Sequence, residues 1–274
     1  MATFQTSDGL NIYFEDQGEG LPILCLPGLT RTTADFDDVT PHLAGNRLIK
    51  MDYRGRGQSD FDPEWQNYAL PVEGRDVLEL MAHLGLDKAA MLGTSRGGLI
   101  AMGLAATAKQ HLLGVALNDI GPHIDPKGID FIMMYLGRDP AAKTHAEMAA
   151  ALAYVFPDFE DVPPERWLRE SQKNYVQTED GLKISYDPKL RDAIEAGRTE
   201  DMPDLWPFFD ALNGLPLATI RGANSKLFVA ETLAEMQTRR PDMITAVVPG
   251  RGHVPFLNEP EAVTALHKWV EQMQ

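Results

Sequence analysis

Short apolar runs alternate with longer amphipathic stretches through the first half of the chain. Each run stops at a glycine, proline, aspartate or asparagine, and the runs cover residues 21–26, 47–51, 89–92 and 113–117. Runs bounded in this way are typical of buried strands. Residues 72–86 and 99–108 have the spacing and composition of helices. Strands that alternate with helices predict a parallel sheet with helices on both faces.

The amino-terminal residues have a different pattern. Residues 3–6 and 11–15 flank Ser7-Asp8-Gly9, a sequence typical of a tight turn. We therefore expect an antiparallel hairpin at one edge of an otherwise parallel sheet, an arrangement that is common in mixed sheets.

The alternation of strand and helix is interrupted between residues 122 and 214. This stretch is rich in methionine and aromatic residues, and its prolines break it into short helices. The alternation then returns at residues 217–220, 227–237, 243–248 and 260–270. We predict one α/β core domain, residues 1–121 and 215–274, with a helical insertion over residues 122–214.

The net charge of the chain argues against polyanionic binding partners. Forty Asp and Glu residues against 25 Lys and Arg give a formal net charge of −15. Nucleic acid and anionic membranes need a basic footprint, so we expect neither as a partner. The apolar fraction of 44% is ordinary for a globular protein. The first residues lack the basic and apolar pattern of a leader, and we expect a cytoplasmic protein.

No motif for a metal or a cofactor occurs in the sequence. The single cysteine, Cys25, lies in a predicted buried strand and is expected to be a small core residue. There is no H-E-x-x-H pattern, no P-loop, and no dinucleotide-binding fingerprint after a strand. We expect a protein that works without cofactor or metal.

The sharpest chemical signal is Gly93-Thr94-Ser95-Arg96-Gly97, which matches G-x-S-x-G. It follows a predicted strand and opens a predicted helix, the setting in which this motif carries a nucleophile. Small flanking residues let the chain turn tightly, so that the side chain of Ser95 projects alone. Its place at a helix N-terminus favours a developing anion.

A serine hydroxyl needs a base to become a nucleophile, and His253 is the candidate. Seven histidines occur in the chain. His253 is the one in a glycine-flanked loop, Pro249-Gly250-Arg251-Gly252-His253, between the last predicted strand and the final helix. The carboxyl end of a strand in an α/β sheet is a favourable place for a catalytic group.

Several motifs in this order resemble the α/β-hydrolase fold family over nearly the whole chain. They are Leu26-Pro27-Gly28-Leu29-Thr30, the turn Asp52-Tyr53-Arg54-Gly55-Arg56-Gly57-Gln58-Ser59-Asp60, the Ser95 elbow, the helical insertion, and Gly252-His253 before Glu259-Pro260-Glu261. The resemblance implies the α/β-hydrolase fold, a mostly parallel sheet flanked by helices with an inserted helical cap. It also implies that the amides of Leu29 and Arg96 form an oxyanion hole.

The third catalytic residue departs from the family pattern. Related sequences tend to have aspartate where this chain has Lys226, and a nearby ammonium would disfavour protonated histidine. Asp119, at the end of the preceding strand, is one substitute, since some members take their acid from that position. Alternatively, Asn224 or Ser225 orients His253 without charge, or activity has been lost while the pocket remains. We favour Asp119.

These residues predict a cofactor-free serine hydrolase that attacks an ester-like carbonyl through an acyl-enzyme. The apolar insertion indicates a small or medium hydrophobic substrate, with Met133, Met134, Trp206 and Phe209 as candidate pocket residues. The alternatives are a carbon–carbon bond hydrolase and a non-catalytic binding protein that keeps the pocket. The sequence sets no oligomeric state.

Overall fold

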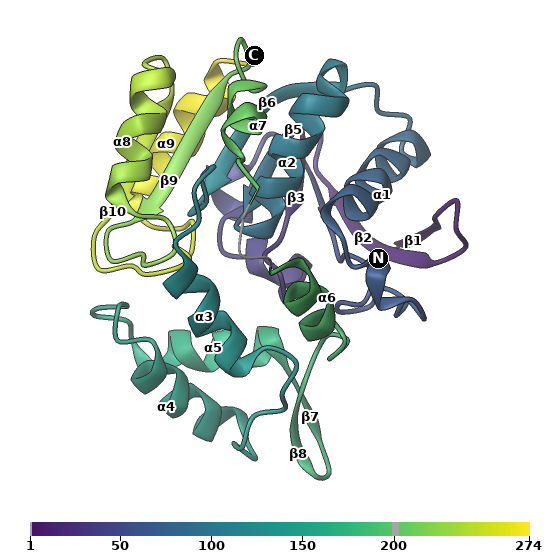
Figure 1. The fold of residues 1–274 in the computed structure, drawn as a ribbon, viewed down its shortest axis with the longest axis vertical. Coiled ribbons are helices and arrows are strands. Elements are labelled where there is room, and N and C mark those ends of the chain that lie inside the picture. Colours follow the sequence, from purple (N-terminus) through teal and green to yellow (C-terminus); the bar gives the residue numbers. More distant parts are fainter. Residues whose placement is uncertain (1, 199–202) are drawn as a thin grey trace.

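The computed structural model describes residues 2–198 and 203–274 and is built on one eight-stranded sheet (Figure 1). The strand order is β1-β2-β4-β3-β5-β6-β9-β10; β2 runs antiparallel to both of its neighbours, β1 and β4, and all other neighbouring strands are parallel. These strands are β1 (Ala2–Gln5), β2 (Asn11–Gln17), β3 (Pro22–Leu26), β4 (Arg47–Met51), β5 (Ala89–Thr94), β6 (Leu112–Asn118), β9 (Leu217–Gly222) and β10 (Ile244–Val248). The predicted mostly parallel sheet with an antiparallel hairpin at its edge is confirmed.

Helices cover both faces of this sheet, as predicted. One face carries α1 (Leu70–His83), α2 (Arg96–Thr107) and α8 (Ala230–Arg239), whose apolar residues belong to one large cluster. The other face carries α9 (Pro260–Glu271). Short 3₁₀ helices connect these elements at η1 (Thr33–Phe36), η2 (Thr40–Leu43), η3 (Trp65–Asn67) and η4 (Lys109–His111).

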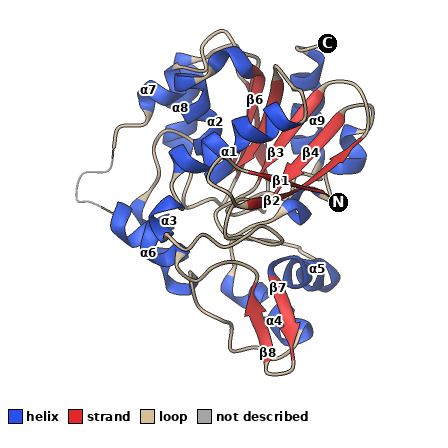
Figure 2. Ribbon diagram, turned by 90° about the vertical axis from the view of Figure 1, so that its right-hand side faces the viewer, coloured by secondary structure: helices blue, strands red, loops and turns tan. Residues whose placement is uncertain are grey.

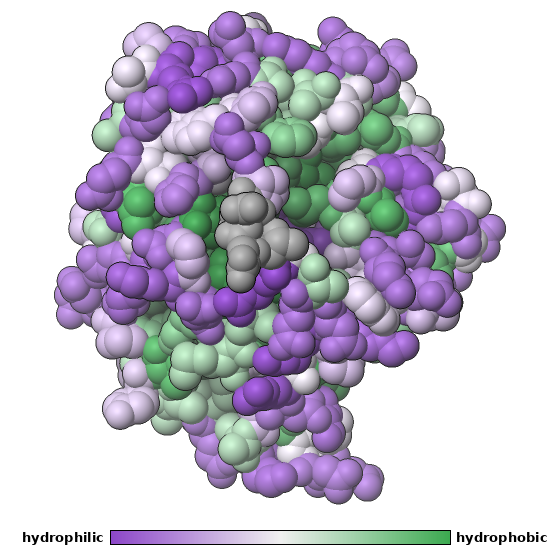
Figure 3. Space-filling view, viewed as in Figure 1, coloured by the Kyte–Doolittle hydropathy of each residue, from purple (hydrophilic) through white to green (hydrophobic). Residues whose placement is uncertain are grey.

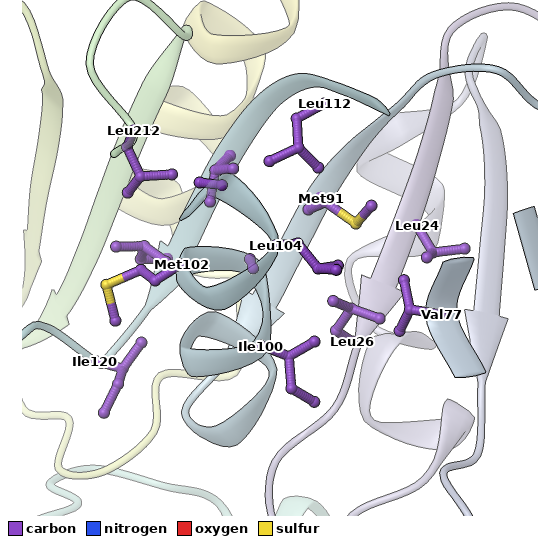
Figure 4. Packing of buried hydrophobic residues seen from close by; sticks show 14 of the residues in the cluster. Leu24, Leu26, Val77, Met91, Ile100, Met102, Leu104, Leu112, Ile120 and Leu212 are labelled. Carbon is purple, nitrogen blue, oxygen red and sulfur yellow. The ribbon is translucent and has the colours of Figure 1, made fainter. Parts of the chain in front are cut away.

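The packing of α2 on the sheet holds the centre of the molecule together. Ile100 and Leu104 of α2 lie beside Leu26 of β3 and Met91 of β5 in the larger apolar cluster (Figure 4). All six residues of β5 are buried, with Met91 in the apolar cluster that contains α2 and Leu92 in the one that contains α9. Burying a leucine or methionine side chain stabilises a fold by about 1.5–3 kcal/mol. The loop between β5 and α2 is therefore fixed at both of its ends.

Most of the segment between β6 and β9 lies below the sheet (Figure 1). It contains α3 (Pro126–Tyr135), α4 (His145–Val155), α5 (Pro164–Asn174), β7 (Tyr175–Thr178), β8 (Gly181–Ile184), α6 (Leu190–Gly197) and α7 (Trp206–Asp210). The antiparallel pair β7–β8 (Figure 2) was not expected from the sequence, where the insertion was predicted to be mostly helical.

Helix α7 differs from the other inserted elements. It falls inside the predicted insertion, residues 122–214, yet it packs against α2 of the core. Phe209 is fully buried there and belongs to the apolar cluster of the sheet and its helices. Residues 199–202, which precede it in the predicted insertion, lie outside the described part of the chain.

None of the helices in residues 2–198 and 203–274 is long and apolar enough to cross a membrane.

Candidate active site

Ser95 stands alone on the turn between β5 and α2. Its φ of 49° is positive, which is uncommon for a residue other than glycine and is stabilised by the packing on either side. A Cβ on Gly93 would lie 2.6 Å from the backbone of Gly97, and one on Gly97 would lie 2.1 Å from Leu26 O. Both neighbours must therefore be glycine, which explains the G-x-S-x-G pattern.

His253 and Asp119 join Ser95 in one hydrogen-bonded chain. His253 Nε2 lies 3.0 Å from Ser95 Oγ, and His253 Nδ1 lies 2.7 Å from Asp119 Oδ2. The three residues follow β5, β6 and β10, whose carboxyl ends meet at one edge of the sheet. This geometry allows Ser95 to pass its proton to an imidazole that a carboxylate orients.

The last residue of β9 and the turn that follows it hold Asp119 in place. Gly222 N donates to Asp119 Oδ1 at 2.7 Å, and Ser225 Oγ donates to Asp119 Oδ2 at 2.6 Å. Asp119 is completely buried and has a φ of 54°. Ser225 therefore contacts the carboxylate and not His253. The interpretation in which Ser225 or Asn224 orients the imidazole directly is wrong, because Asn224 Nδ2 donates to Asp158 O instead.

Lys226 does not act on the imidazole as its position suggested. Its Nζ lies 2.9 Å from Asp158 Oδ2 of the inserted segment, and its side chain is 69% exposed. The described contacts of the His253 ring are those with Ser95 and Asp119. The Lys226 ammonium therefore pairs with a carboxylate and makes no direct contact with the His253 ring.

Two backbone amides near Ser95 are available for an incoming oxygen atom. Arg96 is the first residue of α2, so its N–H has no partner within the helix. Leu29 follows β3 in the loop beside the elbow. In the described part of the chain, neither amide donates a hydrogen bond to a protein acceptor. The roles that the family resemblance implies for Leu29 and Arg96 remain predictions.

A cavity of about 400 Å³ lies between the inserted segment and the carboxyl edge of the sheet. Thr94, Asn118 and His253 form part of its floor. Its walls are largely aromatic, with Tyr135, Phe156, Phe159, Trp167, Tyr175, Tyr186 and Phe256. Burial raises the pKa of Tyr135 to about 12, so its hydroxyl stays protonated at neutral pH and can donate a hydrogen bond. The cavity is large enough for a small organic molecule.

Three of the four expected pocket residues do not line this cavity. Met134 does, but Met133 packs into a small cluster with Leu136 and Leu190. Trp206 and Phe209 pack on the core with α7, and their rings meet edge to face at 5.8 Å. Helical spacing identified apolar residues in this segment but not the direction in which each side chain points.

The cavity also has a charged wall that the sequence analysis missed. Arg31, Asp35, Arg166 and Glu170 lie along it. Arg166 Nη2 lies 2.9 Å from Glu170 Oε1, and Arg31 Nη1 lies 3.3 Å from Glu170 Oε2. Burial raises the pKa of Asp35 against the opposing effect of Arg31. Arg31 directly follows the Leu26–Thr30 loop in the sequence, and this position could have identified it as a residue near the site.

We looked for side chains that could bind a metal ion in the described part of the chain. Within residues 2–198 and 203–274, no group of three or more His, Cys, Asp or Glu side chains is arranged to hold a metal ion.

Comparison with known proteins places this geometry in a family. The family model described as alpha/beta hydrolase fold matches residues 22–260. A 3-hydroxybutyrate-oligomer hydrolase from Cupriavidus necator is 37% identical over 254 residues, which cover 88% of this chain and 85% of that protein. A 2-(acetamidomethylene)succinate hydrolase from Mesorhizobium japonicum is 25% identical over 252 residues, 91% of this chain and 87% of the relative.

A solved structure gives the same result for the fold. The crystal structure of an alpha/beta hydrolase from Novosphingobium aromaticivorans superposes with a TM-score of 0.91 at 35% sequence identity, covering 99% of this chain and 97% of the other. The chain therefore belongs to the α/β-hydrolase fold family, and it is a hydrolase.

Proposed function

We propose that this protein is a serine ester hydrolase that cleaves short oligomers of 3-hydroxybutyrate, or of a closely related hydroxy acid, through an acyl-enzyme. The observation that carries the proposal is the hydrogen-bonded chain from Ser95 through His253 to Asp119. The ester substrate is suggested by the relative that hydrolyses 3-hydroxybutyrate oligomers.

In the proposed reaction, His253 Nε2 takes the proton of Ser95 as Oγ attacks the ester carbonyl carbon. The amides of Leu29 and Arg96 stabilise the negative oxygen of the tetrahedral intermediate. His253 then gives its proton to the departing alkoxide, and the acyl group remains on Ser95. A water molecule, deprotonated by the same imidazole, releases the acid and restores the serine.

Asp119 has two tasks in this scheme. Its carboxylate orients the imidazole so that Nε2 faces Ser95, and its charge stabilises the imidazolium that forms in each step. Gly222 and Ser225 hold the carboxylate through two hydrogen bonds, so it is fixed before the substrate arrives. The inserted elements from α3 to β8 act as a cap that supplies the apolar walls for the methyl and methylene groups of the substrate.

A fluorophosphonate probe and an oligomer assay test the proposal together. We expect the probe to modify Ser95, and we expect the trimer of 3-hydroxybutyrate to be hydrolysed to smaller acids. Both signals should disappear in Ser95→Ala and persist in Ser7→Ala, a change at an exposed serine whose Oγ contacts Glu79. Mass spectrometry locates the modified residue.

Failure of the native protein to react with the probe, together with no hydrolysis of the trimer or of short p-nitrophenyl esters, would contradict the proposal. Such a result would favour the binding-protein alternative. Probe modification without cleavage of any ester would instead favour a serine hydrolase for a different bond.

A further inference from the structure

The aliphatic part of the Arg31 side chain lies close to Ser95, the proposed nucleophile. The loop after β3 turns at residues 28–31, where Arg31 N donates to Gly28 O at 3.2 Å. Arg31 Cγ lies 3.2 Å, and Ser95 Cβ lies 4.0 Å, from the point at which a Cβ would stand on Gly28. The stem of the arginine therefore borders the same small space as the serine.

The guanidinium of Arg31 is only partly engaged by the protein. Both of its contacts use Nη1, with Glu170 Oε2 at 3.3 Å and Asp35 Oδ1 at 3.5 Å. Glu170 is held more closely by Arg166, through Oε1. In the described residues, no acceptor pairs with Nε or Nη2 of Arg31, whose side chain is 29% exposed and lines the cavity.

The charge around the cavity differs from that of the whole chain. The chain carries a formal charge of −15, yet three arginines and three carboxylates line the cavity, Arg31, Arg138, Arg166, Asp35, Asp139 and Glu170. Lys183 Nζ neutralises Asp139 at 2.8 Å. The wall can therefore accept one additional anion.

We infer that Arg31 binds the terminal carboxylate of a hydroxy-acid oligomer, so that the enzyme takes its substrate by the carboxyl end and releases one hydroxy acid in each cleavage. This inference rests on the proposed function. An oligomer of a hydroxy acid has one free carboxylate, at its end, and all its other linkages are neutral esters. Arginine presents parallel N–H groups that suit a carboxylate.

The chemistry of the substrate agrees with the position of Arg31. In the last unit of a 3-hydroxy acid oligomer, the carboxylate is only a few bonds from the carbonyl carbon of the last ester. A carboxylate held by Nε and Nη2 beside the Leu26–Thr30 loop would bring that ester to Ser95. The rest of the oligomer, which is neutral and largely apolar, would extend along the aromatic walls under α4 and α5.

The test compares one substrate with and without its charge. The two substrates are the dimer of 3-hydroxybutyrate, as the free acid, and its methyl ester. For the native protein, Arg31→Gln and Arg31→Lys, the kcat/KM of the free acid is divided by the kcat/KM of the methyl ester. We expect the native protein to prefer the free acid. In Arg31→Gln this ratio should fall about 10–100-fold, as for a lost charged hydrogen bond, mainly through KM. Arg31→Lys should keep part of the preference.

Two further variants identify the group responsible. Arg169→Gln, at a half-exposed arginine outside the cavity lining, should leave the ratio at the native value. A fall in Arg138→Gln with no change in Arg31→Gln would assign the carboxylate to Arg138 and overturn the inference. Modification of Ser95 by a fluorophosphonate in each variant reports that the site is folded.

The position of cleavage gives an independent readout. In a trimer labelled in its carboxyl-terminal unit, we expect the first product to be labelled monomer. Label that appears first in dimer would overturn the inference, as would a native protein that treats acid and methyl ester alike. Either result leaves ester hydrolysis itself intact. Absence of hydrolysis of every ester would instead reject the proposed function, and the inference with it.

Discussion

At the scale of the residue, the position of the Asp119 carboxylate depends on the pairing of two neighbouring strands, β6 and β9. The family resemblance placed the acid after β9, but this chain has Lys226 there. Strands β6 and β9 are neighbours, with Asn118 opposite Ile220. A carboxylate that follows either strand therefore reaches the same point at the edge of the sheet. Here Gly222 at the end of β9 and Ser225 in the following turn bind the carboxylate of Asp119.

We expect Asp119→Asn to lower kcat for ester hydrolysis about 10³–10⁴-fold, with a smaller effect on KM. The amide keeps the shape of the side chain but removes the charge that stabilises the imidazolium, and the equivalent change in serine proteases has an effect of about 10⁴-fold. Steady-state kinetics on a p-nitrophenyl ester measures it.

Ser225→Ala is the matched comparison for Asp119→Asn. It removes one hydrogen bond to the same carboxylate oxygen but leaves the charge, so a loss of about tenfold is expected. Native turnover in Asp119→Asn would remove this residue from the proposed mechanism.

At the scale of the element, a buried ion pair ties α1 to the start of α2. Glu73 of α1 is completely buried, and its two oxygens lie 2.6 Å from Arg96 Nε and 2.7 Å from Arg56 Nη1. Burial opposes the charge of Glu73, but the two guanidinium groups outweigh it and lower its pKa. Arg96 thus turns its side chain away from the cavity while its amide remains at the turn beside Ser95.

Glu73→Gln should lower the free energy of unfolding by about 3–5 kcal/mol, because it leaves two buried guanidinium groups without a carboxylate. Urea denaturation followed by circular dichroism measures the change. Glu235→Gln, which breaks an exposed pair with Arg239, should cost less than about 1 kcal/mol. Equal losses in the two variants would show that burial does not decide the strength of the α1–α2 connection.

Helix α3 of the insertion carries apolar side chains at the surface of the molecule. Met134 of α3 is exposed and Phe131 is partly so, and hydrophobic residues gather over the lower part of the face in Figure 3, where α3 lies in Figure 1. Met134 and Tyr135 also line the cavity. The apolar surface of α3 therefore continues from the outside of the molecule to the inside of the cavity.

At the scale of the whole molecule, Asp52 connects segments that are distant in the sequence. Its Oδ1 accepts from Thr33 N at 2.7 Å and its Oδ2 from Gln58 N at 2.9 Å, while Asp52 N donates to Tyr13 O. Burial raises the pKa of Asp52 to about 6, against the lowering effect of these amides. The folded protein therefore holds this proton at a pH at which the unfolded chain releases it.

The raised pKa makes stability depend on pH in a defined direction. The contribution of Asp52 is fully present below its ordinary pKa near 4 and is lost as the pH rises through 6. Between pH 4 and pH 7, the unfolding free energy of the native protein should fall by about 2–3 kcal/mol relative to Asp52→Asn, which cannot titrate. Urea denaturation of both proteins at several pH values checks this. A constant difference would mean that Asp52 is ionised throughout.

The sequence by itself determined the α/β architecture and pointed to Ser95 and His253 as candidate catalytic residues. Apolar runs that stop at Pro27, Asp52 or Gly93 mark strands because a buried strand and its exposed turn differ sharply in composition. Ser95 and His253 could be found because the turns that hold them need glycines at fixed positions. These are local requirements, and a local pattern records them.

Only the tertiary structure decided which residues from distant parts of the chain are in contact. Ser225 and Asp119 meet because β6 and β9 are adjacent, which no short segment shows. Lys226 contacts Asp158, and Phe209 packs on the core, because the insertion folds back onto α2 and the turn after β9. Arg31 becomes a cavity residue only when α5 brings Glu170 opposite it. Side-chain direction and long-range contact are properties of the packed fold, so they appear only with it.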